Sequence, residues 1–197
     1  LKEAITLANT AAGLVVGKVG TATVSKRELL EALQQTSENL ASKNKSLNEI
    51  SQLCRKLRKN RKRIVMTNGC FDLLHAGHIR LFSASKQLGD TLIVAIDDDD
   101  SVKRLKGPGR PVIGAPERVR ILSALDSVDY VVVFATNELN CVIGAIQPDV
   151  LTKGSDYKSA EVLGRKIVEN YGGRIELIPI TEDISAAQII NSIKNKC

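Results

Sequence analysis

Two histidines three positions apart are the residues best suited to chemistry. His75 and His78 are the only histidines among the 197 residues. They follow a short apolar run at 64–66, which predicts a buried strand, and a polar break at 67–69 that contains glycine. A helix is expected from 77 to 88. A strand, a glycine-containing loop and a helix start together aim backbone N–H groups and a positive dipole end at an anion. The pattern therefore predicts a bound phosphate, with a nucleotide as its first source.

The spacing of this motif limits the alternatives. Residues at i and i+3 of a helix face the same side, so both imidazoles can reach one ligand. Gly77 omits a side chain where a phosphate or a base must approach closely. A pair of surface histidines is the plain alternative, and a zinc site would need further ligands that the neighbouring sequence lacks. A nucleophilic Cys70 would need a base and an acyl-type substrate, and nothing else in the sequence indicates either.

Composition bounds the class of protein. Hydrophobic residues make up 43% and charged residues 25% of the chain, as in a soluble globular protein. No apolar run approaches the roughly 18–20 residues of a membrane helix, and no secretory signal is expected at the N-terminus. Four cysteines without a paired spacing favour free thiols in a reducing cytoplasm.

The net charge of +6 comes largely from one basic run. Residues 55–63 contain seven Lys and Arg residues, and without them the charge balance is near neutral. We interpret the run as a solvated face, or as a basic helix end beside an anionic ligand. Aromatic residues are only 3% of the chain, which argues against a base-stacking surface for nucleic acid.

From position 63 onward, predicted strands and helices alternate. Strands are expected at 64–66, 91–96, 130–134, 150–152 and 175–178. Helices are expected at 77–88, 101–105, 116–124, 139–146, 160–171 and 185–194. This alternation predicts an α/β fold: a Rossmann-like, doubly wound parallel five-stranded sheet with helices on both faces. Ligands of such sheets bind at the carboxyl ends of the strands, where the strand order reverses, and the histidine loop follows such an end.

A helical N-terminal extension precedes this alternation. Residues 1–22 begin as an alanine-rich helix, and a capping box at Ser25 opens a second helix over 26–35. Residues 37–46 are polar and aperiodic, which indicates a linker. A capping box at Ser46 then starts an amphipathic helix through 58, with its apolar residues on one face.

The sequence GCFDLLHAGH resembles the HxGH nucleotidyltransferase superfamily. Further matches follow in the order of that superfamily: a strand and basic loop at 90–112, a helix and strand at 117–134, the segment PDVLTKGSDY, and the closing helix in TEDISAAQIINSI. The resemblance spans 63–194. Within the superfamily, RLKGPGRPV together with KGSDY is most similar to the adenylyltransferase domains of ADP-heptose synthases.

The extension carries a second resemblance. The segment ANTAAGLVVGKVGTATVSKRELLEAL resembles the C-terminal end of ribokinase-like sugar kinases, which precede the adenylyltransferase domain in bifunctional members of that family. The motifs of such kinases lie upstream, so no sugar-kinase activity is expected. The two resemblances divide the chain into a kinase remnant at 1–36, a linker with an amphipathic basic helix at 37–62, and a nucleotidyltransferase domain at 63–197.

The resemblance implies roles for individual residues, and the sequence predicts no protein metal site. Catalytic roles are expected for His75, His78 and Lys106. Nucleotide binding is expected from Asn68, Gly69, Cys70, Phe71, Gly77, Lys153, Gly154, Asp156 and Ser185. Substrate binding is expected from Asp72, Asp99, Arg110 and Arg118.

Charge supports part of this set. Lys106 and Arg110 belong to a basic cluster around two glycines, and a mobile basic loop of this kind suits phosphoryl transfer. Structural alternatives remain open: a solvated loop for the cluster, a surface salt bridge for Arg118, a helix cap for Asp99, and a loop-organising role for Asp72. A plain turn at 153–157 and an N-cap at Ser185 are the corresponding alternatives nearer the C-terminus.

Two positions depart from the pattern of the superfamily. Asp97 stands where relatives usually carry asparagine, which leaves the detail of the substrate open. Ala186 and Ala187 replace a usual pair of hydroxyl residues, so that backbone N–H groups and the helix dipole would have to hold phosphate there.

The implied reaction joins ATP and D-glycero-β-D-manno-heptose 1-phosphate to give ADP-heptose and pyrophosphate, for lipopolysaccharide core synthesis. ATP is a substrate, and Mg²⁺ is expected on its phosphates. The expected partners are these small molecules in the cytoplasm, without nucleic acid or membrane, and a homo-oligomer is left open. The alternatives are a cytidylyltransferase acting on a polyol or amino-alcohol phosphate, and a non-catalytic nucleotide-binding module.

Overall fold

The computed structural model describes residues 2–16, 22–30, 42–155, 162–180 and 186–194. The chain forms two compact units, Leu1–Ser42 and Lys43–Cys197. The first unit contains α1 (Lys2–Val16) and a helical turn that begins at position 26. The predicted capping box at Ser25 is confirmed, because its backbone N–H and hydroxyl both contact Glu28 at 2.8 Å. Several apolar side chains of this unit, including Val16, are exposed.

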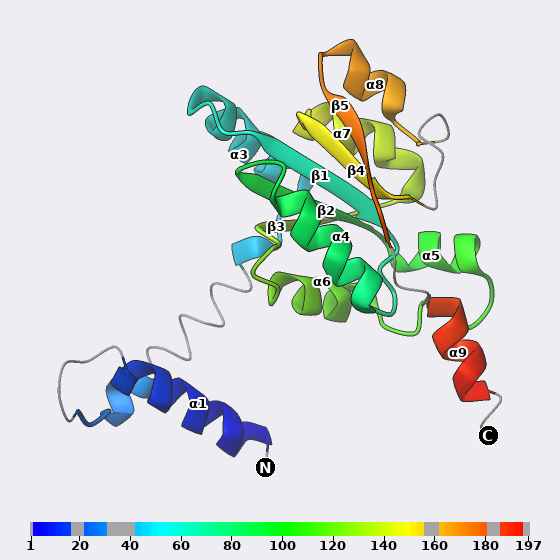
Figure 1. Ribbon diagram of the computed structural model, residues 1–197. Helices are drawn as coiled ribbons and strands as arrows, with labels where there is room; N and C mark the ends of the chain where they lie inside the picture. Colours follow the sequence, from blue (N-terminus) through cyan, green and yellow to red (C-terminus); the bar gives the residue numbers. More distant parts are fainter. Residues whose placement is uncertain (1, 17–21, 31–41, 156–161, 181–185, 195–197) are drawn as a thin grey trace. The chain divides into compact units, whose positions relative to one another are not determined.

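The second unit is built on a parallel sheet of five strands, as predicted (Figure 1). The strands are β1 (Ile64–Gly69), β2 (Thr91–Asp97), β3 (Tyr130–Phe134), β4 (Val150–Gly154) and β5 (Arg174–Ile178). Their order is β3-β2-β1-β4-β5, and every neighbouring pair runs parallel. The central strand β1 therefore has β2 on one side and β4 on the other, which makes the β1–β4 junction the point where strand order reverses.

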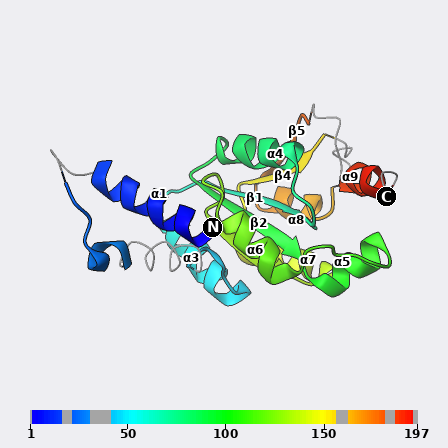
Figure 2. The same ribbon diagram turned by 90° about the horizontal axis from the view of Figure 1, so that it is seen from below.

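Helices cover both faces of the sheet, because successive residues of each strand point to opposite faces. The helices of this unit are α3 (Leu47–Lys59), α4 (Ala76–Lys86), α5 (Asp99–Lys106), α6 (Ala115–Ser123), α7 (Leu139–Ile146), α8 (Arg165–Asn170) and α9 (Ala186–Lys194). A 3-10 turn, η1 (Thr136–Glu138), links β3 to α7. One core cluster joins α3, α7 and α8 to the sheet, and the other joins α4 and α6 to it. Figure 2 shows α4 lying alongside the strands. None of the described helices is long and apolar enough to cross a membrane.

The first strand is longer than predicted. The expected break at 67–69 is wrong, because Thr67, Asn68 and Gly69 continue β1 and pair with Val94, Ala95 and Ile96 of β2. The buried Thr67 hydroxyl donates to the carbonyl of Thr152 at 3.1 Å, so the polar side chain is satisfied inside the sheet. Pairing with β2, joined at Thr67 by pairing with β4, outweighs the turn preference of these residues.

Two predicted helices begin at other positions. The expected helix at 101–105 starts earlier, because the Asp98 carboxylate accepts from the backbone N–H of Ser101 at 2.7 Å and caps α5. The expected helix at 160–171 is shorter, because Gly164 adopts φ 83° and α8 begins only at the next residue. Positions 160 and 161 lie outside the described residues.

Helix α3 belongs to the core of the second unit. Its predicted capping box is confirmed, with the N–H of Ser46 donating to Glu49 at 2.8 Å. Ile50 and Cys54 on its apolar face are fully buried against the sheet. The segment just before it also joins the sheet, since the N–H of Lys45 donates to the carbonyl of Val131 at 2.9 Å. The second unit therefore begins before α3 and not at β1.

Replacing Ile50 with Ala tests this packing. We expect a loss of about 2–5 kcal/mol in the free energy of unfolding of the second unit, because the change leaves a cavity under α3. Arg55→Ala, on the exposed face of the same helix, is the control and should change stability by less than about 0.5 kcal/mol. Both are read from urea unfolding. Equal effects of the two variants would show that α3 contributes nothing to this core.

Candidate active site

A pocket of about 840 Å³ lies at the carboxyl ends of β1, β2 and β4, next to the start of α4. Many of the predicted site residues line it: Asn68, Gly69, Cys70, Phe71, Asp72, His75, His78, Lys106, Arg110, Lys153 and Gly154. The strand order accounts for this convergence. The chain leaves β1 toward β2 and later returns to β4 on the other side, so the connections diverge and leave a crevice.

The two histidines lie against each other in the pocket wall. Their ring centroids are 3.8 Å apart, and the rings are tilted by 31°. His75 occupies the N-cap of α4 with extended backbone, and its side chain makes no capping hydrogen bond. The ring of Phe71 packs edge-on against His78 at 5.1 Å. Phe71 has φ 45°, an uncommon conformation for a bulky side chain, and the end of β1 uses it to carry the ring to this position.

Gly77 serves the histidine pair and is not part of the pocket wall. A β-carbon at this position would lie 3.0 Å from the side chain of Ile180 and 3.2 Å from the ring of His75. The glycine therefore makes room for the imidazole and for the segment after β5. These contacts give Gly77 a structural role, and its expected contact with a nucleotide stays a prediction.

His78 is neutral at neutral pH. Burial lowers its pKa to about 4, the neighbouring His75 adds to this, and a hydrogen bond to the Leu73 backbone opposes it. Two rings in contact cannot both carry charge without strong repulsion. The pair can therefore offer an N–H donor to a phosphate without adding a full positive charge at this point.

Cys70 carries a protonated thiol. Burial raises its pKa to about 11, and the nearby Asp97 carboxylate raises it further, while the charge of Lys106 acts in the opposite direction. A nucleophilic cysteine needs a thiolate, which this environment disfavours. The thiol lies 3.5 Å from an oxygen of Asp97 and is a weak donor to it.

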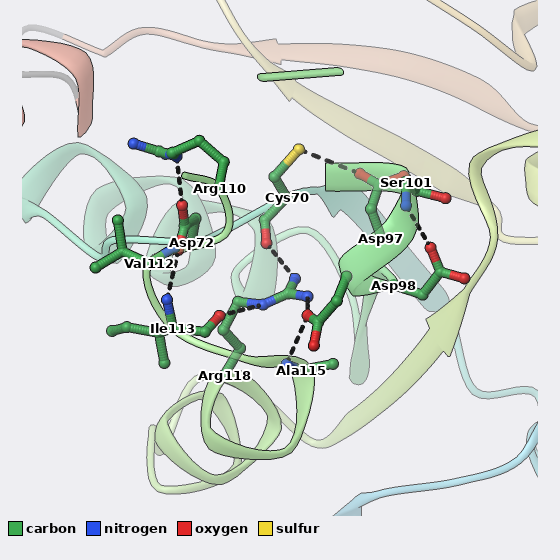
Figure 3. A network of polar contacts seen from close by, with 11 residues as sticks. Cys70, Asp72, Asp97, Asp98, Ser101, Arg110, Val112, Ile113, Ala115 and Arg118 are labelled. Carbon is green, nitrogen blue, oxygen red and sulfur yellow. Dashed lines mark hydrogen bonds and ion pairs between the residues drawn. The ribbon is translucent and has the colours of Figure 1, made fainter. Parts of the chain in front are cut away.

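Arg118 holds the floor of the site together (Figure 3). Its guanidinium is buried, at 1% exposure, and lies outside the pocket wall. It donates to the carbonyl of Cys70 at 2.6 Å, to the carbonyl of Ile113 at 3.1 Å and to the carboxylate of Asp99 at 2.7 Å. The expectation of a surface salt bridge or a phosphate contact for Arg118 is corrected, because every nitrogen of its head group faces protein.

Asp99 also lies outside the pocket wall. The oxygen that pairs with Arg118 accepts from the backbone N–H of Ala115 at 2.8 Å, where α6 begins. The cap expected of Asp99 on the helix that follows is supplied by Asp98 instead, and Asp99 contacts the first residue of α6.

Asp72 ties the basic loop to the histidine loop. One carboxylate oxygen accepts from the backbone N–H groups of Val112 and Ile113 at 2.8 and 2.9 Å. The other lies 2.7 Å from Nε of Arg110, an ion pair without the alignment of a hydrogen bond. Asp72 is only 4% exposed, so its organising role is plain. It holds Arg110 at the edge of the pocket, where Lys106 also lies.

Lys153 connects the two central strands at the pocket. Its Nζ donates to the carbonyl of Asn68 at 2.6 Å, so the end of β4 is joined to the end of β1. The side-chain oxygen of Asn68 is buried in the pocket wall and accepts from no described residue. A ligand with an N–H or O–H group could satisfy it.

Three expectations concern the C-terminal third of the chain. Asp156 and Ser185 lie outside the described residues. The plain turn considered at 153–157 falls partly on β4, which continues to Gly154. Ala186 and Ala187 do line the pocket, at the start of α9, so their missing hydroxyl groups are missing from the wall itself.

The sequence interpretation missed part of the wall. Asp97 and Thr136 line the pocket, although neither was expected to bind a ligand. The signal for Asp97 was its place directly after a buried strand, at the carboxyl end where such sheets bind ligands. Thr136 follows the end of β3 in the same way. Apolar wall residues came from separate segments: Leu81, Leu105, Leu139, Val162, Leu163 and Ile180.

The arrangement can bind and polarise a polyphosphate. The imidazoles of His75 and His78 and the cationic side chains of Lys106 and Arg110 line the same pocket. No group of three or more His, Cys, Asp or Glu residues within the described ranges could hold a metal ion. Positioning and charge stabilisation of a transferring phosphoryl group suit such a site.

The low pKa of His78 predicts a pH-dependent stability. The unfolded chain protonates this histidine near its ordinary pKa of 6.5, whereas the folded protein does so only near pH 4. Its contribution is therefore complete above pH 6.5 and is lost as the pH falls toward 4. As the pH falls over this range, we expect the free energy of unfolding to decrease more for the unchanged protein than for His78→Gln, because glutamine does not titrate. Denaturant unfolding at pH 7.0, 6.0, 5.0 and 4.5 measures it, and parallel curves for the two proteins would contradict it.

Comparison with other proteins places the fold and the site in a family. The "Cytidylyltransferase-like" family model matches residues 66–192. This range contains all five strands apart from the first two residues of β1. The chain is 54% identical over 194 residues to "Bifunctional protein HldE" of Desulfatibacillum aliphaticivorans, and 43% identical over 196 residues to the protein of that name from Syntrophotalea carbinolica. These alignments cover 98% and 100% of this chain but 40% of each relative. The chain thus spans well under half the length of the relatives it matches.

Two solved structures share the fold. The lipopolysaccharide core biosynthesis protein from Thermoplasma volcanium has a TM-score of 0.53 and 26% identity, over 62% of this chain and 99% of that one. Pantoate-beta-alanine ligase from Francisella tularensis has the same TM-score at 16% identity, over 76% and 75% of the two chains, and supports the fold alone. With its parallel sheet, its paired histidines at the switch point and the family match over most of the second unit, the chain belongs to the cytidylyltransferase-like family.

Proposed function

We propose that this chain carries an adenylyltransferase. It forms ADP-heptose and pyrophosphate from ATP and D-glycero-β-D-manno-heptose 1-phosphate, for lipopolysaccharide core synthesis. The observation that carries the proposal is a pocket lined both by the paired rings of His75 and His78 and by the cationic Lys106 and Arg110. The names of two similar proteins support it: the relatives called HldE, which match nearly all of this chain, and the lipopolysaccharide core biosynthesis protein with the same fold.

The reaction is an in-line displacement at the α-phosphorus of ATP. A phosphate oxygen of the sugar 1-phosphate forms the new P–O bond, and the bond to the bridging oxygen of pyrophosphate breaks. No covalent enzyme intermediate is needed, so the protein contributes alignment and charge stabilisation. The neutral His78 ring donates a hydrogen bond to a phosphate oxygen as negative charge builds there.

The cationic edge of the pocket has a separate task. Lys106 and Arg110 attract the phosphates, and Asp72 keeps Arg110 from swinging into solvent. Mg²⁺ bound to the triphosphate supplies further neutralisation of the leaving pyrophosphate. The pocket fits this use, because Mg²⁺ in such sites takes its oxygen ligands mainly from phosphate and water, with one or two carboxylates at most.

The division of the chain follows from the same proposal. Residues 1–36 would derive from the end of a ribokinase-like domain, residues 37–62 from a linker and basic helix, and residues 63–197 from the nucleotidyltransferase domain. The burial of Ile50 and Cys54 of α3 within the second unit supports a working domain that includes this helix. We place the reaction in the cytoplasm, where ATP is available and the free thiols of Cys54, Cys70 and Cys141 stay reduced.

A cytidylyltransferase is the second candidate, and the description of the matching family favours it. Pyrophosphate release decides between the two when ATP and CTP are each supplied with heptose 1-phosphate and with glycerol 3-phosphate. We expect turnover with ATP and heptose 1-phosphate. A preference for CTP would overturn the adenylyl assignment, and nucleotide binding without pyrophosphate release from any pair would indicate a non-catalytic module.

Two lysines of α5 provide a matched test of the charged edge. Lys106 lines the pocket, whereas Lys103, in the same helix, is exposed and lies outside the wall. We expect Lys106→Ala to reduce kcat/KM for ATP by about 10- to 100-fold, because it removes a charge-assisted contact to phosphate. Lys103→Ala should leave kcat/KM within about twofold, since Lys103 is exposed, lies outside the pocket wall and has its charge screened by salt. The same loss in both variants would mean that only the overall charge of the helix matters.

A further inference from the structure

The β2 side of the pocket holds a carboxylate that the proposed chemistry does not use. Asp97 is the last residue of β2, is 6% exposed and lines the pocket. One of its oxygens accepts from the hydroxyl of Thr136 at 2.6 Å. The other lies 3.5 Å from the thiol of Cys70, and Figure 3 shows this thiol directed toward it.

These contacts leave Asp97 incompletely satisfied. An ionised carboxylate can accept about four hydrogen bonds. Asp97 receives one from a hydroxyl and one from a thiol, which is a weak donor, and it forms no ion pair with any residue that the structure describes. Burial of a charge is costly unless donors surround it. A donor from a bound molecule would supply what the protein leaves out.

The position of Asp97 indicates which molecule supplies that donor. The histidine pair and Lys153 lie toward α4 and β4, where the phosphates of a nucleotide meet the start of α4. Asp97 and Thr136 lie at the ends of β2 and β3, on the other side of β1. Lys106 is also near, because its charge acts on the Cys70 thiol. A molecule that places its phosphate by Lys106 can therefore place a hydroxyl against Asp97.

We propose that Asp97 is a specificity-determining residue that accepts a hydrogen bond from a hydroxyl group of the acceptor sugar phosphate, with Thr136 as its positioning residue. The inference rests on the proposed function and adds to it the residues that recognise the acceptor. Asparagine at this position would offer one acceptor oxygen and one donor group in place of two acceptor oxygens. Asp97 thus favours an acceptor that donates at this point.

Thr136 is itself held in place. Its backbone N–H donates to the hydroxyl of Ser101 at 2.9 Å, so the turn after β3 is joined to the first turn of α5. Its hydroxyl can then fix the rotation of the Asp97 carboxylate through the 2.6 Å bond. Loss of this hydroxyl should misorient the carboxylate without removing it.

The test compares Asp97→Asn with Asp100→Asn, the same chemical change at an exposed position of the same acidic run. Pyrophosphate release is measured with ATP and heptose 1-phosphate, and then with analogues of the sugar that each lack one hydroxyl. We expect Asp97→Asn to raise KM for the complete acceptor by about 10- to 100-fold and to leave KM for ATP within about twofold. Asp100→Asn should match the unchanged protein.

The analogues locate the contact. For one of them, the ratio of KM values between Asp97→Asn and the unchanged protein should fall to near one, because the hydroxyl that Asp97 reads is already gone. Thr136→Val should raise KM for the acceptor by about 3- to 10-fold, and Thr136→Ser should restore it, since serine keeps the hydroxyl. Unchanged melting of all variants establishes that they fold.

Each other outcome overturns the inference in a recognisable way. An unchanged KM for the acceptor in Asp97→Asn, with normal turnover of the unchanged protein, removes Asp97 from acceptor recognition and leaves the proposed function intact. An increase only in the Mg²⁺ concentration needed for half-maximal rate would make Asp97 a metal contact instead. No turnover of the unchanged protein with any sugar phosphate would contradict the proposed function itself.

Discussion

The central constraint of this molecule is the parallel pairing of β1 with strands on both of its sides. β2 pairs with β1 along its whole length and β4 pairs with it from Val65 to Thr67, so the strand runs on through Asn68 and Gly69 to the pocket. The segment that leaves this strand must then rise from the middle of the sheet, where connections diverge to either side. The histidine loop stands there, where the pocket meets the start of α4.

A second layer of order comes from two ion pairs, Asp72–Arg110 and Arg118–Asp99, each with one buried partner. Asp72 and Arg118 each join the histidine loop to the segment around Ile113, by backbone hydrogen bonds as well as by charge. Buried charges of this kind are stable only with most of their hydrogen bonds made. Their contribution is geometric, since they hold the basic loop next to the histidines and leave Lys106 and Arg110 at the edge of the pocket.

The electrostatics of the pocket follow from this burial. His78 and Cys70 are both neutral near pH 7, for the common reason that burial disfavours their charged forms. The charges that face the pocket are carried by long cationic side chains at one edge and by the Asp97 carboxylate beside β3. The pocket is therefore divided into a region suited to phosphate and a region suited to donor groups.

The sequence alone determined the class of fold and the place of the site. Alternating apolar segments set the five parallel strands and their helices, and the pattern around His75 and His78 marked the phosphate-binding loop, because these signals are local in the chain. The resemblance to known nucleotidyltransferases also supplied half of the pocket wall. The resemblance did not separate the side chains that line the pocket from those, such as Arg118 and Asp99, that contact other parts of the protein.

Only the tertiary structure decided which polar residues face the pocket and which face protein. The sequence suggested that Arg118 and Asp99 lie at the surface or bind a ligand, but in the structure they form an ion pair with each other. Asp97, from the same acidic run as Asp99, lines the pocket. Gly77 serves the ring of His75, a contact set partly by Ile180 from a distant segment. These choices depend on partners about 20 to 100 positions away along the chain, and local sequence patterns contain no information about such distances.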